Sequence, residues 1–162
     1  MNYHNITTDD MKNGVGLRVV LWVSGCSHHC KNCHNPITWD PKEGLPFDKK
    51  AESELFSALE PDYISGITLS GGDPLHLENR EEMTLLVEKI RKQFPEKTIW
   101  LYTGYVWEEI HQLPIMKNLD VLVDGRFIEE QKNLKLHWKG SANQRVLDVQ
   151  KSLAANTVIL YL

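Results

Sequence analysis

Residues 17–33 read LRVVLWVSGCSHHCKNC, a continuous apolar run that leads directly into a loop containing every cysteine of the chain, Cys26, Cys30 and Cys33. The apolar, β-branched run is typical of a buried strand. A disulfide framework would need an even number of cysteines spread around the fold, and this chain has three within eight residues. The stretch therefore predicts a strand that ends at a metal site.

The spacing C-x3-C-x2-C suits a loop that wraps three thiolates around one inorganic group. A [4Fe-4S] cluster held wholly by protein takes four thiolates. Cys26, Cys30 and Cys33 would thus bind three irons and leave the fourth with an exchangeable position. We predict no catalytic residue beyond these ligands.

Two other readings of the cysteines stay open at this point. His28, His29 or His34 would complete a Cys3His zinc site, because zinc prefers a closed tetrahedron of nitrogen and sulfur ligands, although this spacing is unusual for zinc. A zinc site would make the protein a binding adaptor without catalysis. A thiol nucleophile is the other reading, but neighbouring thiols do not replace a dedicated base.

Further apolar runs are continuous rather than alternating, as is typical of strands covered on both faces in a parallel sheet. They are ITL (67–69), TIWLY (98–102), VLV (121–123) and TVILYL (157–162). Between them, apolar residues from Met83 to Phe94 recur at helical spacing. A shorter helix with Leu55 and Leu59 on its apolar face is expected to begin at the N-cap Asp48.

This order of elements predicts right-handed βαβ units whose ligand loops gather beyond the carboxyl ends of the strands. The chain has 162 residues, whereas a full eight-unit barrel typically takes ~250. We therefore expect an α/β fold with a parallel-sheet partial (β/α) barrel and a single domain over residues 1–162. Residues 129–143 lack clear periodicity and are expected to form a surface excursion.

Composition narrows the class of protein. Hydrophobic residues make up 41% and charged residues 25% of the chain, and no apolar stretch approaches the ~20 residues that span a bilayer. The start, MNYHNITTDD, does not read as a secretory signal, so we expect a cytoplasmic protein without a membrane partner. The formal charge of -4 and the lack of a basic block argue against nucleic acid binding.

The cysteine motif after a first strand resembles the radical S-adenosylmethionine (SAM) superfamily. Flanking segments narrow the resemblance to the activating enzymes of glycyl-radical proteins, in the branch that serves anaerobic ribonucleotide reduction. These segments are NGVGLR (13–18), CHNPITWD (33–40), SGGDPL (70–75), YTGY (102–105), VDGRF (123–127) and GSANQRVLDV (140–149). Activases of pyruvate formate-lyase share CHN and TWD but have longer chains, and they are the alternative within this chemistry.

The resemblance implies an oxidoreductase with two cofactors, a [4Fe-4S] cluster and SAM. The amino and carboxylate groups of SAM would bind the open iron, and reductive cleavage would yield a 5′-deoxyadenosyl radical. That radical would take a hydrogen atom from a glycine in the large subunit of anaerobic ribonucleoside-triphosphate reductase. Reduced flavodoxin is the implied electron donor.

The segment SGGDPL is the second expected cofactor site. Gly71 and Gly72 allow the backbone to approach a ligand closely, and Asp73 is suited to accept hydrogen bonds from an ammonium group. In the superfamily this position commonly carries Gly-Gly-Glu or a variant. By resemblance, Gly72 and Asp73 would bind SAM.

The residues around the third cysteine depart from the superfamily pattern. Asn32 stands where many members carry an aromatic residue, so backbone contacts of Asn32, Cys33 and His34 with SAM are expected instead. The VDGRF segment lacks the Asp-x-Lys of some related activases, which leaves the roles of Asp124 and Arg126 open. The roles of YTGY and GSANQR stay open too.

Overall fold

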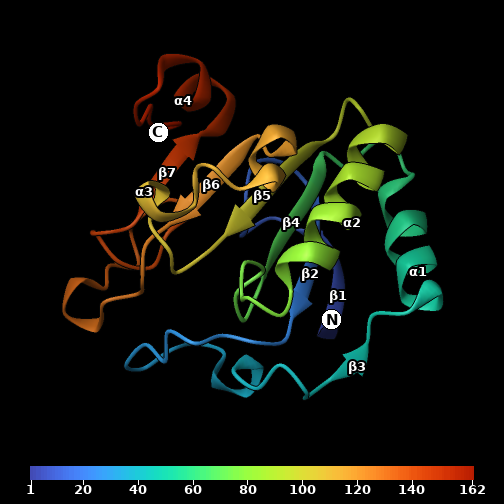
Figure 1. Ribbon diagram of the computed structural model, residues 1–162, viewed down its shortest axis with the longest axis horizontal. Helices are drawn as coiled ribbons and strands as arrows, with labels where there is room; N and C mark the ends of the chain where they lie inside the picture. Colours follow the sequence, from blue (N-terminus) through green and yellow to red (C-terminus); the bar gives the residue numbers. More distant parts are fainter.

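The computed structural model describes residues 1–162 and contains a seven-stranded sheet with the order β3-β1-β2-β4-β5-β6-β7 (Figure 1). The strands are β1 (Asn2–Asp10), β2 (Arg18–Val23), β3 (Leu45–Pro46), β4 (Gly66–Gly71), β5 (Thr98–Tyr102), β6 (Val121–Asp124) and β7 (Arg145–Asp148). The central strands β2, β4, β5 and β6 are parallel neighbours, whereas β1, β3 and β7 pair antiparallel at the edges. The predicted α/β class is confirmed, and the sheet is mixed rather than wholly parallel.

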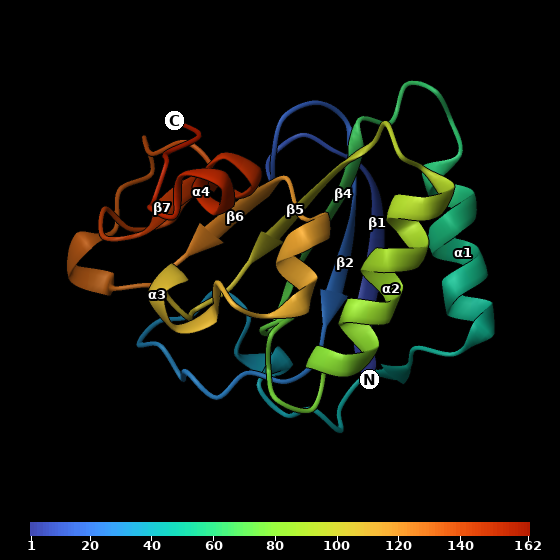
Figure 2. The same ribbon diagram turned by 45° about the horizontal axis from the view of Figure 1, so that its top comes forward.

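Two long helices cover one face of the sheet, where α1 and α2 lie side by side (Figure 2). The helices are α1 (Lys49–Leu59), α2 (Arg80–Gln93), α3 (Trp107–Ile110) and α4 (Val149–Ala155), with short 3-10 turns at η1 (Pro36–Thr38), η2 (Pro114–Asn118) and η3 (Glu129–Gln131). As predicted, Asp48 caps α1 by accepting a hydrogen bond from Ala51 N at 3.0 Å. None of the helices has the length and apolar character that a bilayer crossing needs.

Both faces of the central strands are buried, which explains their continuous apolar runs. The larger core cluster includes Leu69 and Leu101 and fills the space under the helices with Leu55 and Met83. A smaller cluster on the opposite face is centred on Trp100. The core that the apolar patterns predict is therefore present on both sides of the sheet.

The predictions for the two chain ends were incomplete. The strand predicted at 17–23 is present as β2, but it is the second strand of the chain. Residues 2–10 form β1 beside it, and their polar, half-exposed pattern hid that strand. The run TVILYL at 157–162 is not a strand, since only Leu160 makes an isolated bridge. Within this run, Tyr161 packs edge-on against Trp100 with ring centroids 5.4 Å apart.

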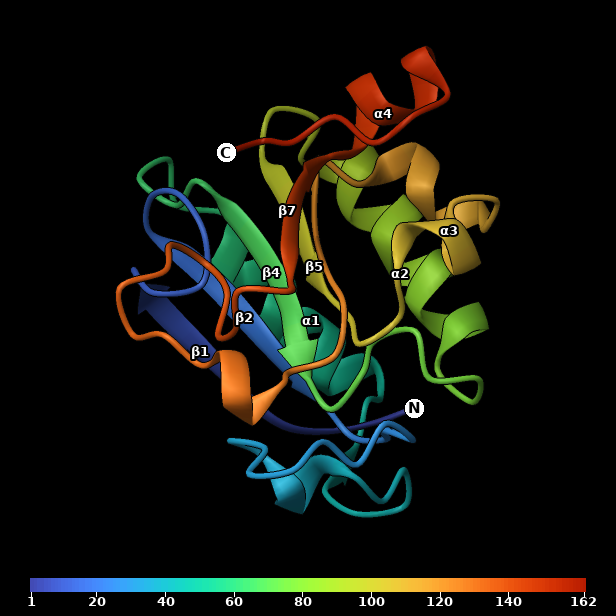
Figure 3. The same ribbon diagram turned by 90° about the vertical axis from the view of Figure 1, so that its left-hand side faces the viewer.

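Residues 125–143, between β6 and β7, include the surface excursion expected at 129–143 and are together called the excursion below. They lie on the face of the sheet away from α2 and α3, beside the loop that joins β1 to β2 (Figure 3). Trp138 packs edge-on against Trp100 at 5.7 Å, so the excursion contacts the open face of the sheet. This face of the sheet is therefore partly covered by a loop instead of a helix.

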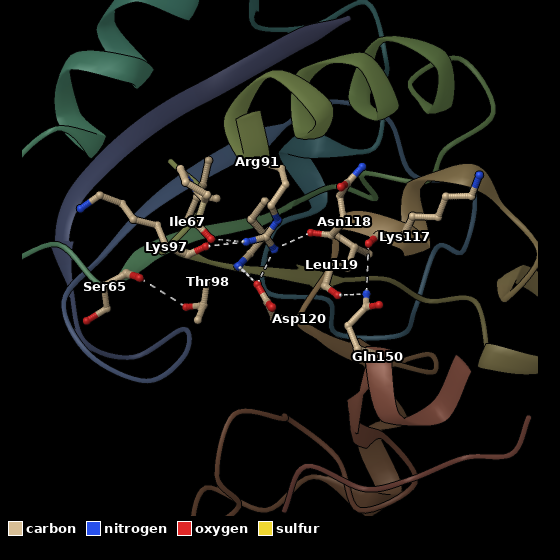
Figure 4. Close-up of polar contacts among 12 residues, drawn as sticks. Ser65, Ile67, Arg91, Lys97, Thr98, Lys117, Asn118, Leu119, Asp120 and Gln150 are labelled. Carbon is tan, nitrogen blue, oxygen red and sulfur yellow. Dashed lines mark hydrogen bonds and ion pairs between the residues drawn. The ribbon is translucent and has the colours of Figure 1, made fainter. Parts of the chain in front are cut away.

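Polar side chains hold the opposite end of the sheet, near the amino ends of β5 and β6. Arg91 at the end of α2 donates to Asn118 O at 2.7 Å and to the Asp120 carboxylate at 2.6 Å (Figure 4). Gln150 of α4 donates to Leu119 O at 2.7 Å. These bonds fix the helices to the loop that precedes β6.

Arg18 of the NGVGLR segment is fully buried without a carboxylate partner. Its Nε donates to Thr68 Oγ1 at 2.9 Å, and its Nη2 donates to the carbonyls of Ile67 and Thr98 at 2.7 and 2.9 Å. Its guanidinium lies 5.4 Å from the centroid of the Trp100 ring. Burial lowers the pKa of Arg18 to about 10, and the side chain stays charged at neutral pH.

Candidate functional site

A cavity of about 510 Å³ opens at the carboxyl ends of the parallel strands. Each of the loops that follow these strands contributes to it, with Cys26 after β2, Gly72 after β4, Thr103 after β5 and Gly125 after β6. The βαβ order predicts this placement, because the carboxyl ends of parallel strands meet at one edge of the sheet. The cavity is therefore where a ligand of this fold belongs.

The cysteine loop is tied back at its base by backbone hydrogen bonds. Gly25 N donates to Thr38 O at 2.7 Å, and Cys26 N donates to Trp39 O at 2.9 Å. The turn η1 begins with a proline and buries Thr38. The intervening residues form a closed loop whose two ends are fixed beside each other.

All three thiols are free, half-buried and exposed to the same cavity. Cys33 N donates to Cys30 O at 3.1 Å, which turns the loop between these residues. Burial raises the pKa of the Cys26 thiol to about 11. Thiolate ligands must lose their protons to bind iron, so cluster binding at this loop would release protons.

This donor set fits a [4Fe-4S] cluster. No three His, Cys, Asp or Glu side chains converge on a single metal position. A cubic cluster does not require that convergence, because each thiolate binds a different iron. The three cysteines line one cavity, as three thiolates on one cluster would require.

Each of the three histidines near the cysteines packs against an aromatic ring. His29 stacks on Trp39 with ring centroids 4.5 Å apart and planes 7° apart. His34 lines the cavity and lies 5.6 Å from the Phe127 ring. The third, His28, contacts Asp73 and makes an edge-on contact with a tyrosine ring. His28 and His34 line the same cavity as the three thiols, whereas His29 does not.

Asp73 is the most heavily hydrogen-bonded side chain of the site. Its buried carboxylate accepts from Leu75 N at 2.8 Å, Thr103 Oγ1 at 2.9 Å and Gly104 N at 3.0 Å. His28 Nε2 lies 2.6 Å from Asp73 Oδ2, and both side chains are at most 4% exposed. The carboxylate therefore joins the cysteine loop to the loops that follow β4 and β5.

Two glycines are needed because these loops approach one another closely. A Cβ on Gly72 would lie 2.5 Å from Gly25 O and 2.7 Å from Thr38 O, both backbone atoms of the cysteine loop. A Cβ on Gly104 would lie 2.6 Å from Nε2 of His28. Side chains at these positions would push the cysteine loop away from the sheet.

The structure brings most of the sequence-predicted site residues together. Cys26, Cys30, Cys33, His34, Gly72 and Asp73 all line the cavity. Asn32 does not, since it is exposed and has a positive φ of 57° in the turn before Cys33.

Two residues whose roles were left open lie outside the cavity lining. Arg126 is exposed, whereas Asp124 is buried and accepts from Arg145 Nη2 at 2.6 Å and from Trp107 N at 2.7 Å. The hydrogen bond that Arg145 donates to Asp124 raises the pKa of Arg145, and the bond that it donates to Glu108 lowers the pKa of Glu108. Asp124 thus holds β6 to β7 and α3.

Sequence reasoning missed four residues of the site. Thr103 and Gly104 belong to YTGY, Gln144 belongs to GSANQR, and His28 belongs to the cysteine loop itself. A signal was available for the first two, because YTGY ends a strand adjacent to the one that ends in SGGDPL. No comparable local signal marks His28 or Gln144.

Comparison with known proteins agrees with the cysteine geometry. Residues 12–147 match the model of the 4Fe-4S single cluster domain. The chain is 48% identical over 146 residues to the anaerobic ribonucleoside-triphosphate reductase-activating protein of Enterobacteria phage T4, covering 90% of this chain and 93% of that protein.

Bacterial relatives with the same name show similar identity. That of Escherichia coli K12 is 43% identical over 150 residues, covering 90% of this chain and 97% of its own. That of Vibrio cholerae is 43% identical over 148 residues, covering 89% and 96%. The chain belongs to the family of anaerobic ribonucleoside-triphosphate reductase-activating proteins, built on a 4Fe-4S single cluster domain.

Proposed function

We propose that this chain, as one activase domain over residues 1–162, activates an anaerobic ribonucleoside-triphosphate reductase by generating a glycyl radical on its large subunit. The observation that carries the proposal is the placement of Cys26, Cys30 and Cys33 on one cavity with Gly72 and Asp73. The names of the relatives support the choice of target. The activity is that of an oxidoreductase of the radical SAM type.

The three cysteines would hold three irons of a [4Fe-4S] cluster. When bound, the cluster would supply one electron and an open iron to SAM, whose reductive cleavage gives methionine and a 5′-deoxyadenosyl radical that takes hydrogen from the glycine Cα. Cofactors carry such chemistry, and the protein orients them. We propose reduced flavodoxin as the electron donor.

The chain itself would bind and orient SAM. Asp73 is proposed to accept a hydrogen bond from the SAM ammonium, and Gly72 lets the backbone lie beside it. The backbone of Cys33 and His34 would contact SAM from the cysteine loop, and Asn32, outside the cavity lining, would shape the turn before them. Asp73 and Gly72 line the same cavity as the three cysteines, which supports this role.

The sheet is proposed to be an open, partial (β/α) barrel of the radical SAM type. Four parallel neighbours, a cavity at their carboxyl ends and helices on the outer face support this view. The excursion at 125–143 lies across the inner face, where it would limit the access of water. Exclusion of water matters because a reactive intermediate must meet its target before it meets solvent.

The test is anaerobic incubation of cluster-loaded protein with SAM, reductant and a matching reductase, followed by electron paramagnetic resonance. A glycyl-type doublet on the large subunit is the expected result. Deuterium at the target glycine should also appear in 5′-deoxyadenosine. Deuterium that comes only from solvent would contradict direct abstraction, and a protein with zinc but no acid-labile sulfide would contradict the whole proposal.

A further inference from the structure

The segment GSANQR ends beside the cavity, at the base of the excursion. Asp124 pairs with Arg145 in the β6–β7 ladder, so Gln144 stands opposite Gly125, where the chain leaves β6. Gly125 has a positive φ of 97°, and its N–H donates to Tyr105 O at 2.9 Å. Both Gly125 and Gln144 line the cavity.

The Gln144 side chain joins the two ends of the excursion. Its Oε1 accepts from Gly140 N at 2.9 Å and from Ser141 N at 3.1 Å. Its Nε2 donates to Gly125 O at 2.9 Å. Two N–H donors face one end of the amide and a carbonyl faces the other, so these contacts fix the amide orientation.

The joined segment carries Phe127, which faces the cysteine loop. A Cβ on Gly140 would lie 3.1 Å from the Phe127 ring, so the ring rests directly on the backbone that Gln144 holds. On its other side, Phe127 lies 5.6 Å from the ring of His34, the residue after Cys33. Gln144 is thus linked to the cysteine loop through one layer of packed rings.

We infer that Gln144 is a positioning residue that sets the cavity wall opposite the cysteine loop and thereby the affinity for SAM. The inference rests on the proposed function, because it takes SAM as the ligand of this cavity. Without the amide, Gly140 and Ser141 would lose their acceptor and Gly125 its donor, and the wall would no longer be held at a fixed distance from His34. Gln144 itself transfers no proton or electron.

The test compares Gln144→Leu with Gln150→Leu in cluster-loaded protein. Gln150 is a matched control, because its amide also holds backbone carbonyls, at the far end of β6 (Figure 4). SAM affinity is measured by anaerobic equilibrium dialysis, and iron content shows that the cluster is retained. Gln144→Leu should weaken SAM binding about tenfold, as expected for the loss of several hydrogen bonds, while Gln150→Leu should leave it unchanged.

A second variant and a second readout keep the test decisive. Gln144→Glu keeps the acceptor for the two N–H groups but sets an oxygen against Gly125 O, so it should also weaken SAM binding. Trypsin should cut at Lys132 and Lys135 faster in both Gln144 variants, and added SAM should slow the cut less than in the wild type. Faster cutting with unchanged SAM affinity would overturn the inference. If the proposed function itself were wrong, the wild-type protein would form no glycyl radical. That result can be told apart from a failure of the Gln144 inference.

Discussion

His28 Nε2 lies 2.6 Å from Asp73 Oδ2, so the loop that carries the cysteines is bonded to the loop that follows β4. Both side chains are almost wholly buried. The distance between the two atoms is that of a short hydrogen bond. The contact therefore sets how the three thiols face the sheet.

Replacing His28 should loosen the cysteine loop without unfolding the protein. His28→Ala leaves Asp73 without one of its donors, and we expect cluster iron to be lost to a chelator several times faster, as for a contact of about 1 kcal/mol or more. His29→Ala is the control, since His29 is exposed and stacks only on Trp39. Equal rates of iron loss in the two variants would show that the contact does not hold the loop.

The cysteine ligands can be tested one at a time. Protein purified without oxygen should be brown and contain about four irons and four sulfides per chain. Cys26→Ala, Cys30→Ala and Cys33→Ala should each lose the cluster and the activity together. Full iron retention in all three variants would refute the assignment.

Asp73→Ala should weaken SAM binding and also reduce stability. Loss of a charge-assisted hydrogen bond to SAM costs about 1.5–3 kcal/mol, or roughly ten- to a hundred-fold in Kd. The unpaired donors of Thr103 and Gly104 should lower the free energy of unfolding by about 1–3 kcal/mol, measured by urea titration. Asp48→Ala, which removes a helix cap, should reduce stability by about 1 kcal/mol and leave SAM affinity unchanged. A cluster-loaded Asp73→Ala protein with normal SAM affinity would exclude the SAM role.

Arg18 should tolerate no exchange for lysine. Lysine lacks the planar fork that reaches the Thr68 hydroxyl and the carbonyls of Ile67 and Thr98 together. We expect Arg18→Lys to lower the free energy of unfolding by about 2–4 kcal/mol, as for buried polar groups left without partners. Arg91→Lys, at a half-exposed site, should cost less. The comparison requires only urea titrations of the two variants without cofactor.

The sequence predicted those elements of the fold whose residue pattern has a single physical cause. The central strands are buried on both faces, which makes them continuous apolar runs, and the cap at Asp48 is a local hydrogen bond. The strand at 2–10 was missed because its residues are polar and half-exposed. The run TVILYL misled because an apolar run need not pair with a strand: only Leu160 makes a bridge, and Tyr161 packs on Trp100.

In the site, too, features set by neighbouring residues were predicted from the sequence, whereas contacts between residues far apart in the sequence were not. Cysteine spacing is local and readable, so the three thiols were placed correctly on one cavity. The pairing of His28 with Asp73 joins residues 45 positions apart, and the bond from Gln144 to Gly125 joins residues 19 apart. Such pairs follow from how loops meet at a sheet edge, which no local pattern records.

The antiparallel strands at both edges of the sheet have an evolutionary consequence. Because β7 returns beside β6 as a hairpin partner, the chain between them can lengthen or shorten without changing the register of any central strand. Leu134 near its tip is 90% exposed, so insertions there would meet only solvent or another protein. A change of length at that tip would leave Cys26, Cys30 and Cys33 in place, because these residues lie on a different loop.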